Sequence, residues 1–164
     1  MAYQLTNLII LGIDPGTTRI GFGIIRKDGG KLIPLHYGII PYSSSDDKPI
    51  KTVITEITKL INAYQPKIAA VEKIFFFKNQ KTIISVSEMR GVILAALELS
   101  NIPIREYTPL QVKQSVSSYG RAEKDQVQRM VRLILKIGTD IKPDDAADGL
   151  AIAICCANNI IYEN

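Results

Sequence analysis

Hydrophobic residues near the N-terminus fall into three short runs separated by turn residues. The runs cover residues 7–14, 19–26 and 31–40, and Pro15-Gly16 and Lys27-Asp28-Gly29-Gly30 lie between them. Apolar, β-branched runs bounded by turn signals are typical of strands, and short connections join antiparallel neighbours. The first quarter of the chain is therefore predicted to be a meander of three antiparallel strands.

From residue 48 onward the hydrophobic spacing changes to that of helices. Apolar residues recur every three or four positions in the segments 48–64, 78–100, 110–116, 122–136 and 143–160, which predicts amphipathic helices. Two short apolar runs, 67–72 and 102–107, lie between them and predict two more strands. Because the second run contains Pro103, we expect it at an edge or at a strand start. This order predicts an α/β fold with a mixed five-stranded sheet, an antiparallel meander followed by alternating β and α elements, flanked by helices.

Length and composition favour a single globular domain spanning residues 1–164. The chain is 46% hydrophobic and 22% charged, values that leave no room for a large disordered fraction. Its net charge of +4 permits an anionic partner without requiring one.

Cysteine usage and hydropathy indicate a reduced, cytoplasmic protein. Cys155 and Cys156 are the only cysteines, and their adjacency excludes a C-x-x-C redox or zinc pair. No apolar stretch reaches the roughly 18 residues of a membrane span, and the N-terminus lacks the pattern of a secretory signal. We therefore expect buried cysteines and no membrane contact.

Four carboxylates stand out by their positions. Asp14 and Glu72 each end a predicted buried strand, and Asp145 and Asp148 lie three residues apart near the start of the last helix. Asp14 could instead cap the Pro-Gly turn, and Asp144 is explained as an acid at a helix N-terminus. Asp148 is harder to explain in this way because a long apolar run follows it.

The chemistry of these side chains favours a hard divalent cation. Clustered, half-buried carboxylates need a counter-charge, and no arginine partner is evident near them in the sequence. Oxygen ligands without His or Cys favour Mg²⁺ or Mn²⁺, and His36, the only histidine, is interpreted as a structural residue of the third strand. Two such ions can assist phosphodiester hydrolysis by water, without a covalent nucleophile.

Six short motifs occur in a fixed order along nearly the whole chain. They are Gly12-Ile13-Asp14-Pro15-Gly16, Val71-Glu72-Lys73-Ile74-Phe75 with Lys78-Asn79, Met89-Arg90-Gly91, Gln111-Val112-Lys113-Gln114, Ala122-Glu123-Lys124 and Asp145-Ala146-Ala147-Asp148. Each is weak alone, but the ordered set resembles the RuvC family of bacterial Holliday junction resolvases, in the ribonuclease H-like superfamily. The resemblance implies a ribonuclease H-like fold and a magnesium-dependent endodeoxyribonuclease.

The resemblance also implies a set of metal ligands and catalytic lysines. The metal-binding catalytic carboxylates are then Asp14, Glu72, Asp145 and Asp148, with Asp145 and not Asp144 as the ligand. Lys113 and Lys124 match two family lysines implicated in junction binding and catalysis.

DNA contacts are expected beyond these lysines. Phe75 matches a family aromatic that stacks on a base near the crossover, and core packing is the alternative for at least one ring of Phe75-Phe76-Phe77. Lys78, Arg90 and Arg121 are further candidates for phosphate contacts, with a solvated charged face as the alternative for each. Phe76 and Phe77 carry no assigned role.

The implied assembly is a homodimer that nicks two strands of like polarity symmetrically across a four-way DNA junction. Cleavage would leave 5′-phosphate and 3′-hydroxyl ends and use two Mg²⁺ ions per site, with Mn²⁺ as a substitute. The family partners are the branch-migration proteins RuvA and RuvB.

Three alternatives remain open at this point. The segment Thr18-Arg19-Ile20-Gly21 is more like that of YqgF nucleases, which suggests action on structured RNA but leaves Phe75 and the lysines unexplained. Residues 14–18 also resemble a phosphate loop of actin-like ATP-binding proteins, which need two such domains. An inactive DNA-binding module is disfavoured because an unused carboxylate cluster would only add repulsion.

Overall fold

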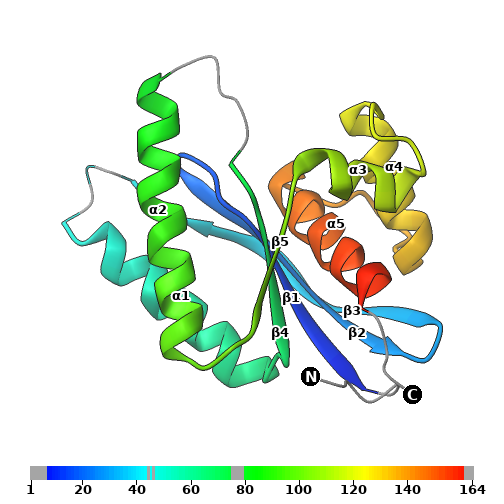
Figure 1. Cartoon of the computed structure of the whole chain (residues 1–164), viewed down its shortest axis with the longest axis horizontal. Helices are drawn as coiled ribbons and strands as arrows, with labels where there is room; N and C mark the ends of the chain where they lie inside the picture. The colour runs from blue at the N-terminus through cyan, green and yellow to red at the C-terminus, as the bar shows by residue number, and fades with distance from the viewer. Residues whose placement is uncertain (1–6, 44, 46, 75–79, 161–164) are drawn as a thin grey trace.

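A twisted five-stranded sheet forms the centre of the molecule, in the strand order β3-β2-β1-β4-β5 (Figure 1). The structure is a computed structural model and describes residues 7–43, 45, 47–74 and 80–160. The strands are β1 (Leu8–Asp14), β2 (Arg19–Asp28), β3 (Lys31–Pro41), β4 (Ile68–Glu72) and β5 (Ile104–Tyr107). The first three are antiparallel, whereas β4 and β5 continue the sheet in parallel with β1. The mixed five-stranded sheet predicted from the sequence is confirmed, with β5 at an edge and beginning just after Pro103.

Helices cover both faces of the sheet. On one face lie α1 (Pro49–Tyr64) and α2 (Gln80–Leu99), and on the other lie α3 (Pro109–Ser117), α4 (Lys124–Leu135) and α5 (Asp144–Asn159) (Figure 1). Each helix begins and ends within two residues of its predicted bounds. No helix in the described ranges is both long enough and apolar enough to span a bilayer.

Side-chain alternation along β1 determines which way Asp14 points. Ile10 belongs to the core under α5, whereas Leu11 and Ile13 belong to the core under α1 and α2. Because successive residues of a strand face opposite sides, Gly12 and Asp14 share the α5 face with Ile10. The carboxylate at the end of β1 is thereby directed toward α5.

The same alternation places Glu72 beside Asp14. Ile68 and Ala70 of β4 lie in the core under α5, so Glu72, two residues further along, faces the same way. In the parallel register Gly12 pairs with Ala70 and the next residue with Val71. Extending this register by one residue on each strand brings Asp14 beside Glu72.

Glycines allow α5 to lie directly on the sheet. A Cβ atom added to Gly149 would lie 2.5 Å from the backbone carbonyl carbon of Phe22, and one added to Gly23 would lie 2.6 Å from the Cα atom of Leu150. A neighbouring backbone cannot withdraw from such a contact without moving the helix. Only residues without a side chain therefore permit this approach.

The close approach extends to the start of α5. Cβ atoms added to Gly12 and Gly21 would collide with the backbone carbonyl oxygens of Gly149 and Asp145. The first turns of the helix, with Asp145 and Asp148, are consequently held over the ends of β1 and β2. Gly12, Gly21 and Gly23 therefore allow α5 to pack directly on β1 and β2.

The entry to α3 is well defined by its cap. The Thr108 hydroxyl accepts a hydrogen bond from the Gln111 backbone N–H at 3.2 Å, and the Gln111 side chain accepts one from the Thr108 N–H at 2.8 Å. This reciprocal capping box, with Pro109 in the first turn, fixes where the helix begins. The prediction of Thr108 as the N-cap is confirmed.

The two cysteines belong to α5 and lie in the hydrophobic core between the sheet and the helices on that face. Cys155 and Cys156 are both fully buried and unpaired. Burial raises the pKa of each thiol to about 11, so neither is a thiolate at neutral pH. The expectation of buried core cysteines is confirmed.

Candidate active site

A cavity of about 210 Å³ opens where the ends of β1 and β4 meet α3, α4 and α5. Three of the four predicted carboxylates line it, namely Asp14, Glu72 and Asp148, together with Lys113 and Lys124. The remaining lining side chains are all apolar: Pro109, Val112, Val127 and Ala151. Acidic groups and two lysines thus share one small pocket whose other walls are apolar.

Asp14 and Glu72 are strongly perturbed by this environment. Burial, followed by the charges of Glu72, Asp148 and Asp145, raises the pKa of Asp14 well above its ordinary value. Burial and then the charge of Asp148 raise the pKa of Glu72 to about 7, against the opposing effects of a hydrogen bond with Asp14 and the charge of Lys113. Near neutral pH the pair therefore retains a proton that exposed carboxylates would lose.

Asp148 shares its environment with Lys124. Burial raises the pKa of Asp148, and the nearby ammonium of Lys124 partly offsets this. The Lys124 Nζ atom lies 3.4 Å from Asp148 Oδ2 and 3.7 Å from Asp144 Oδ2. Burial by itself lowers the pKa of Lys124, but the charges of Asp148 and Asp144 outweigh it and leave the pKa raised. Lys124 is therefore a firmly charged cation at the mouth of the carboxylate cluster.

Asp145 has an arginine partner that the sequence did not reveal. Arg19 Nε lies 2.9 Å from Asp145 Oδ2, and Asp145 is not among the side chains that line the cavity. The sequence showed no arginine near Asp145, and the partner comes from a distant segment of the chain. The antiparallel pairing of β1 with β2 brings Arg19 to the strand end beneath the first turn of α5, which is a tertiary effect with no local signature.

The candidate DNA contacts fall in different settings. Lys113 lines the cavity, and Arg121 is exposed in the loop between α3 and α4. The Arg90 side chain is only 18% exposed: its Nε donates to the Glu72 backbone oxygen at 3.1 Å and its Nη2 lies 2.9 Å from Glu106 Oε1. Arg90 is thus directed at the end of β4. Phe75 and Lys78, with Phe76 and Phe77, lie outside the described residues.

His36 is remote from the cavity. Its ring lies 5.2 Å from that of Phe22 and stacks at 5.4 Å on that of Tyr64. Phe22 and Tyr64 both belong to the core on the α1 and α2 side of the sheet. These contacts agree with the structural role expected for the histidine.

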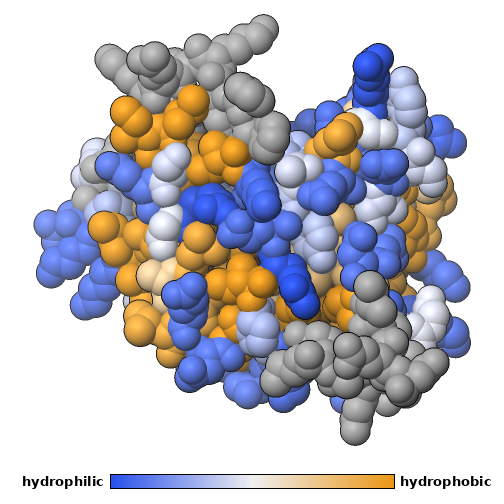
Figure 2. All heavy atoms as spheres, in the orientation of Figure 1, coloured by the Kyte–Doolittle hydropathy of each residue, from blue (hydrophilic) through white to orange (hydrophobic). Residues whose placement is uncertain are grey.

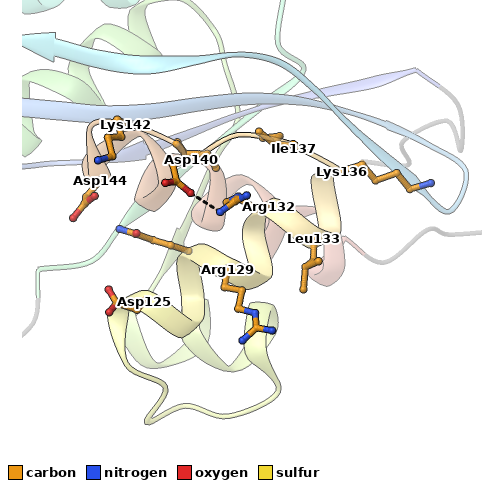
Figure 3. A pocket seen from close by; sticks show the side chains of 12 residues that line it. Asp125, Arg129, Arg132, Leu133, Lys136, Ile137, Asp140, Lys142 and Asp144 are labelled. Atoms are coloured by element: carbon orange, nitrogen blue, oxygen red, sulfur yellow. Dashed lines mark hydrogen bonds and ion pairs between the residues drawn. The ribbon is translucent and has the colours of Figure 1, made fainter.

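A larger cavity, of about 770 Å³, lies between α4 and the connection to α5 (Figure 3). Arg132 and Asp140 form an ion pair in its wall, and Figure 3 shows Arg129 and Lys136 pointing away from Asp140. Arg132 and Asp140 thus neutralise each other in this wall. The smaller cavity is the one that concentrates reactive groups.

The donor set of the smaller cavity fits a hard divalent cation. Its acidic side chains are all carboxylates. Burial, and then their mutual repulsion, raises the pKa values of Asp14 and Glu72, and a bound cation would relieve the repulsion. Within residues 7–43, 45, 47–74 and 80–160, no three His, Cys, Asp or Glu side chains are already arranged as a complete metal site. The residues present therefore suit a cation but do not enclose one by themselves.

Comparison with known proteins identifies the family. The family model for crossover junction endodeoxyribonuclease RuvC matches residues 10–156. The RuvC protein of Petrotoga mobilis is 50% identical over 153 residues, which cover 92% of this chain and 94% of that protein. This chain belongs to the RuvC family. The family and the resolvase class of nuclease predicted from the sequence are confirmed.

Other RuvC proteins extend the agreement to the structure. The RuvC protein of Heliobacterium modesticaldum is 45% identical over 94% of this chain and 97% of its own length. The solved structure of Thermus thermophilus RuvC in complex with a Holliday junction substrate superposes with a TM-score of 0.86 at 31% identity, covering 92% of this chain and 93% of that one. The ribonuclease H-like RuvC fold is thereby confirmed.

Proposed function

We propose that this RuvC-family chain resolves four-way DNA junctions by metal-dependent hydrolysis at the carboxylate cavity. The observation that carries the proposal is the convergence of Asp14, Glu72 and Asp148 with Lys113 and Lys124 in one pocket. Asp145, on the first turn of the same helix as Asp148, adds its charge to the field acting on Asp14. We assign all four carboxylates as the ligands of two Mg²⁺ ions, for which Mn²⁺ can substitute.

When bound, the divalent ions supply positive charge to the attacking water and to the leaving oxygen of the phosphodiester. The carboxylates orient the site and give up the proton that Asp14 and Glu72 retain near neutral pH. Lys124 and Lys113 place fixed positive charge at the mouth of the cavity, where a backbone phosphate must arrive. Cleavage of this kind leaves 5′-phosphate and 3′-hydroxyl ends.

Arg90 is better suited to positioning than to phosphate binding. Its guanidinium is committed to the Glu72 backbone oxygen and to Glu106. By joining the ends of β4 and β5 it would hold the Glu72 side chain at the cavity. Arg121, which is exposed, remains a proposed phosphate contact.

A homodimer is proposed because a four-way junction presents two equivalent strands of like polarity. Two-fold symmetry in the protein would place one cavity at each strand and give symmetric nicks. Exposed apolar side chains lie on α1 (Ile50 and Ile54) and on α2 (Ile84), and Figure 2 shows hydrophobic residues gathered over these helices. This face is the candidate for the contact between copies.

The cellular setting is proposed from the family and the cysteines. Buried, unpaired Cys155 and Cys156 suit the reducing cytoplasm. The chain is proposed to act there as one nuclease domain spanning residues 1–164, with RuvA and RuvB as its branch-migration partners.

The test is a denaturing gel of end-labelled substrates incubated with Mg²⁺ or EDTA. Synthetic four-way junction, matched linear duplex and structured RNA are compared with the same protein preparation. Symmetric nicks at the junction that require Mg²⁺ support the proposal. Preferential cutting of the RNA, or equal cutting of the duplex, would contradict it.

Replacing Lys113 or Lys124 by Ala is expected to weaken junction cleavage and to flatten its dependence on salt. Each contact between a lysine and a phosphate releases counterions. The loss of one contact should therefore make the plot of log association constant against log salt concentration less steep by about 0.9. The measurement is junction affinity and cleavage rate between about 50 and 200 mM salt.

Lys31→Ala provides the matched control for these variants. Lys31 is exposed at the start of β3, at the opposite end of the sheet from Asp14. This variant should keep the wild-type slope. An unchanged slope in Lys113→Ala and Lys124→Ala would argue against phosphate contact by these lysines.

A further inference from the structure

The turn between α3 and α4 is held firmly by its own backbone contacts. The Ser117 Oγ atom lies 2.7 Å from the Lys113 oxygen and 2.9 Å from the Tyr119 oxygen, and the Tyr119 oxygen also accepts a hydrogen bond from the Ala122 N–H at 3.1 Å. Ala122 itself is buried under the turn. The backbone of Tyr119 is thus fixed from both sides.

This turn packs against the helix start that borders the cavity. A Cβ atom added to Gly120 would lie 2.6 Å from Leu110 Cδ1, so the turn and the first turn of α3 are in contact. Pro109, the neighbour of Leu110 in the chain, lines the carboxylate cavity. The turn therefore adjoins the first turn of α3, and we call these two segments together the rim, because α3 begins at the cavity.

Both rim side chains face solvent although they are large and apolar. Tyr119 is 57% exposed and Leu110 is 58% exposed. A single exposed apolar residue is ordinary, but here two occur together on an ordered rim. Within the described ranges no hydrogen bond holds the Tyr119 hydroxyl. A binding partner would therefore meet an exposed aromatic ring on a backbone that is already held in place.

The rim is also cationic. Arg121 is exposed next to Tyr119, and Lys113 and Lys124, on the two helices that the turn connects, line the cavity. Figure 1 shows α3 and α4 on one side of the sheet and α2 on the other. An aromatic platform beside cations is the arrangement that binds unpaired nucleotides.

We propose that Tyr119 stacks on an unpaired base of the DNA strand that enters the carboxylate cavity, with Leu110 completing the apolar surface. The proposal rests on the proposed function, since it requires a base pair beside the crossover of a four-way junction to open when the protein binds. Stacking needs the ring but not the hydroxyl. It also releases no counterions, which distinguishes Tyr119 from the neighbouring lysines.

The test measures junction affinity by fluorescence anisotropy in EDTA at several salt concentrations, for wild type, Tyr119→Phe and Tyr119→Ala. Tyr119→Ala is expected to lose about tenfold in affinity at every salt concentration, because one stacked base contributes about that much. Tyr119→Phe should stay within about twofold of wild type, as the ring is kept. 2-Aminopurine placed beside the crossover should be quenched by wild type and Tyr119→Phe but not by Tyr119→Ala.

Leu133→Ala is the matched control, because Leu133 is a 63% exposed apolar residue of α4 that lines the larger cavity. It should bind as wild type does. Wild-type affinity in Tyr119→Ala, or equal losses in Tyr119→Phe and Tyr119→Ala, would overturn the stacking proposal while leaving the proposed function in place. If wild type itself shows no preference for the junction over linear duplex, the proposed function fails and this proposal fails with it.

Discussion

Asp14→Asn is expected to abolish junction cleavage while leaving junction binding close to that of the wild type. Asp14 faces α5 from the end of β1 and interacts electrostatically with Glu72, Asp145 and Asp148. An amide there removes the charge that would hold a divalent ion, and the several kcal/mol that such an ion provides correspond to a loss of about a thousandfold or more. Binding should be spared because the change removes a charge that repels phosphate.

The same result is expected for Glu72→Gln, Asp145→Asn and Asp148→Asn. The measurement is the cleavage rate at saturating Mg²⁺, with affinity determined separately in EDTA. Asp28→Asn, at the exposed far end of β2, is the matched control and should cleave normally. Loss of binding in all four variants, with folding intact, would contradict the assignment of these residues as metal ligands.

Gly149→Ala is expected to destabilise the protein and to inactivate it. The added methyl group would meet the backbone of Phe22 at 2.5 to 2.7 Å, so α5 must move away from the sheet. Overpacking of this kind costs about 3 kcal/mol, which is about 6–12 °C in Tm for a chain of this size. Since α5 carries Asp145 and Asp148, cleavage should fall even at temperatures where the variant remains folded.

Gly91→Ala is the matched control for this prediction. Gly91 lies in α2 with no atom within 4 Å of an added Cβ, and replacing an exposed helical glycine by alanine stabilises by up to about 1 kcal/mol. Thermal unfolding of both variants is compared in EDTA. A wild-type Tm for Gly149→Ala would show that α5 can shift without loss of stability, and the proposed need for glycine where α5 packs on the strands would be wrong.

The sequence predicted the elements well because each carries a local signal. Hydrophobic periodicity predicted α1, α5 and the strands, and Thr108 with Pro109 marked the start of α3. Asp14 and Glu72 were conspicuous because a charge at the end of an apolar strand is unusual. These signals lie within a few residues of the feature that they predict.

The parts that the sequence did not predict depend on residues far apart in the chain. The ion pair of Arg19 with Asp145 forms only when β1 pairs with β2 and α5 packs on the sheet. The strand glycines that contact α5 have no distinctive local signal, because their role depends on the packing of α5 against them. Arg90 looked like a free cation, but its contacts to Glu72 and Glu106 arise only when β4 and β5 lie side by side.

The central claim is that the carboxylate cavity exchanges a retained proton for divalent cations. In the protein without metal, burial and mutual repulsion raise the pKa of Asp14 and bring that of Glu72 to about 7, so the pair is partly protonated below that pH. Cation binding requires ionised carboxylates and must release this proton. At higher pH the proton is already lost, so less should be released and binding should tighten.

The most direct test is calorimetric titration of Mn²⁺ into the full chain at pH 6 and pH 8, in buffers with different ionisation enthalpies. We expect about one proton released per site at pH 6, less release and tighter binding at pH 8, and loss of both effects in Asp14→Asn. Asp28→Asn should titrate like the wild type. Binding without proton release at pH 6, or unchanged binding in Asp14→Asn, would contradict the account.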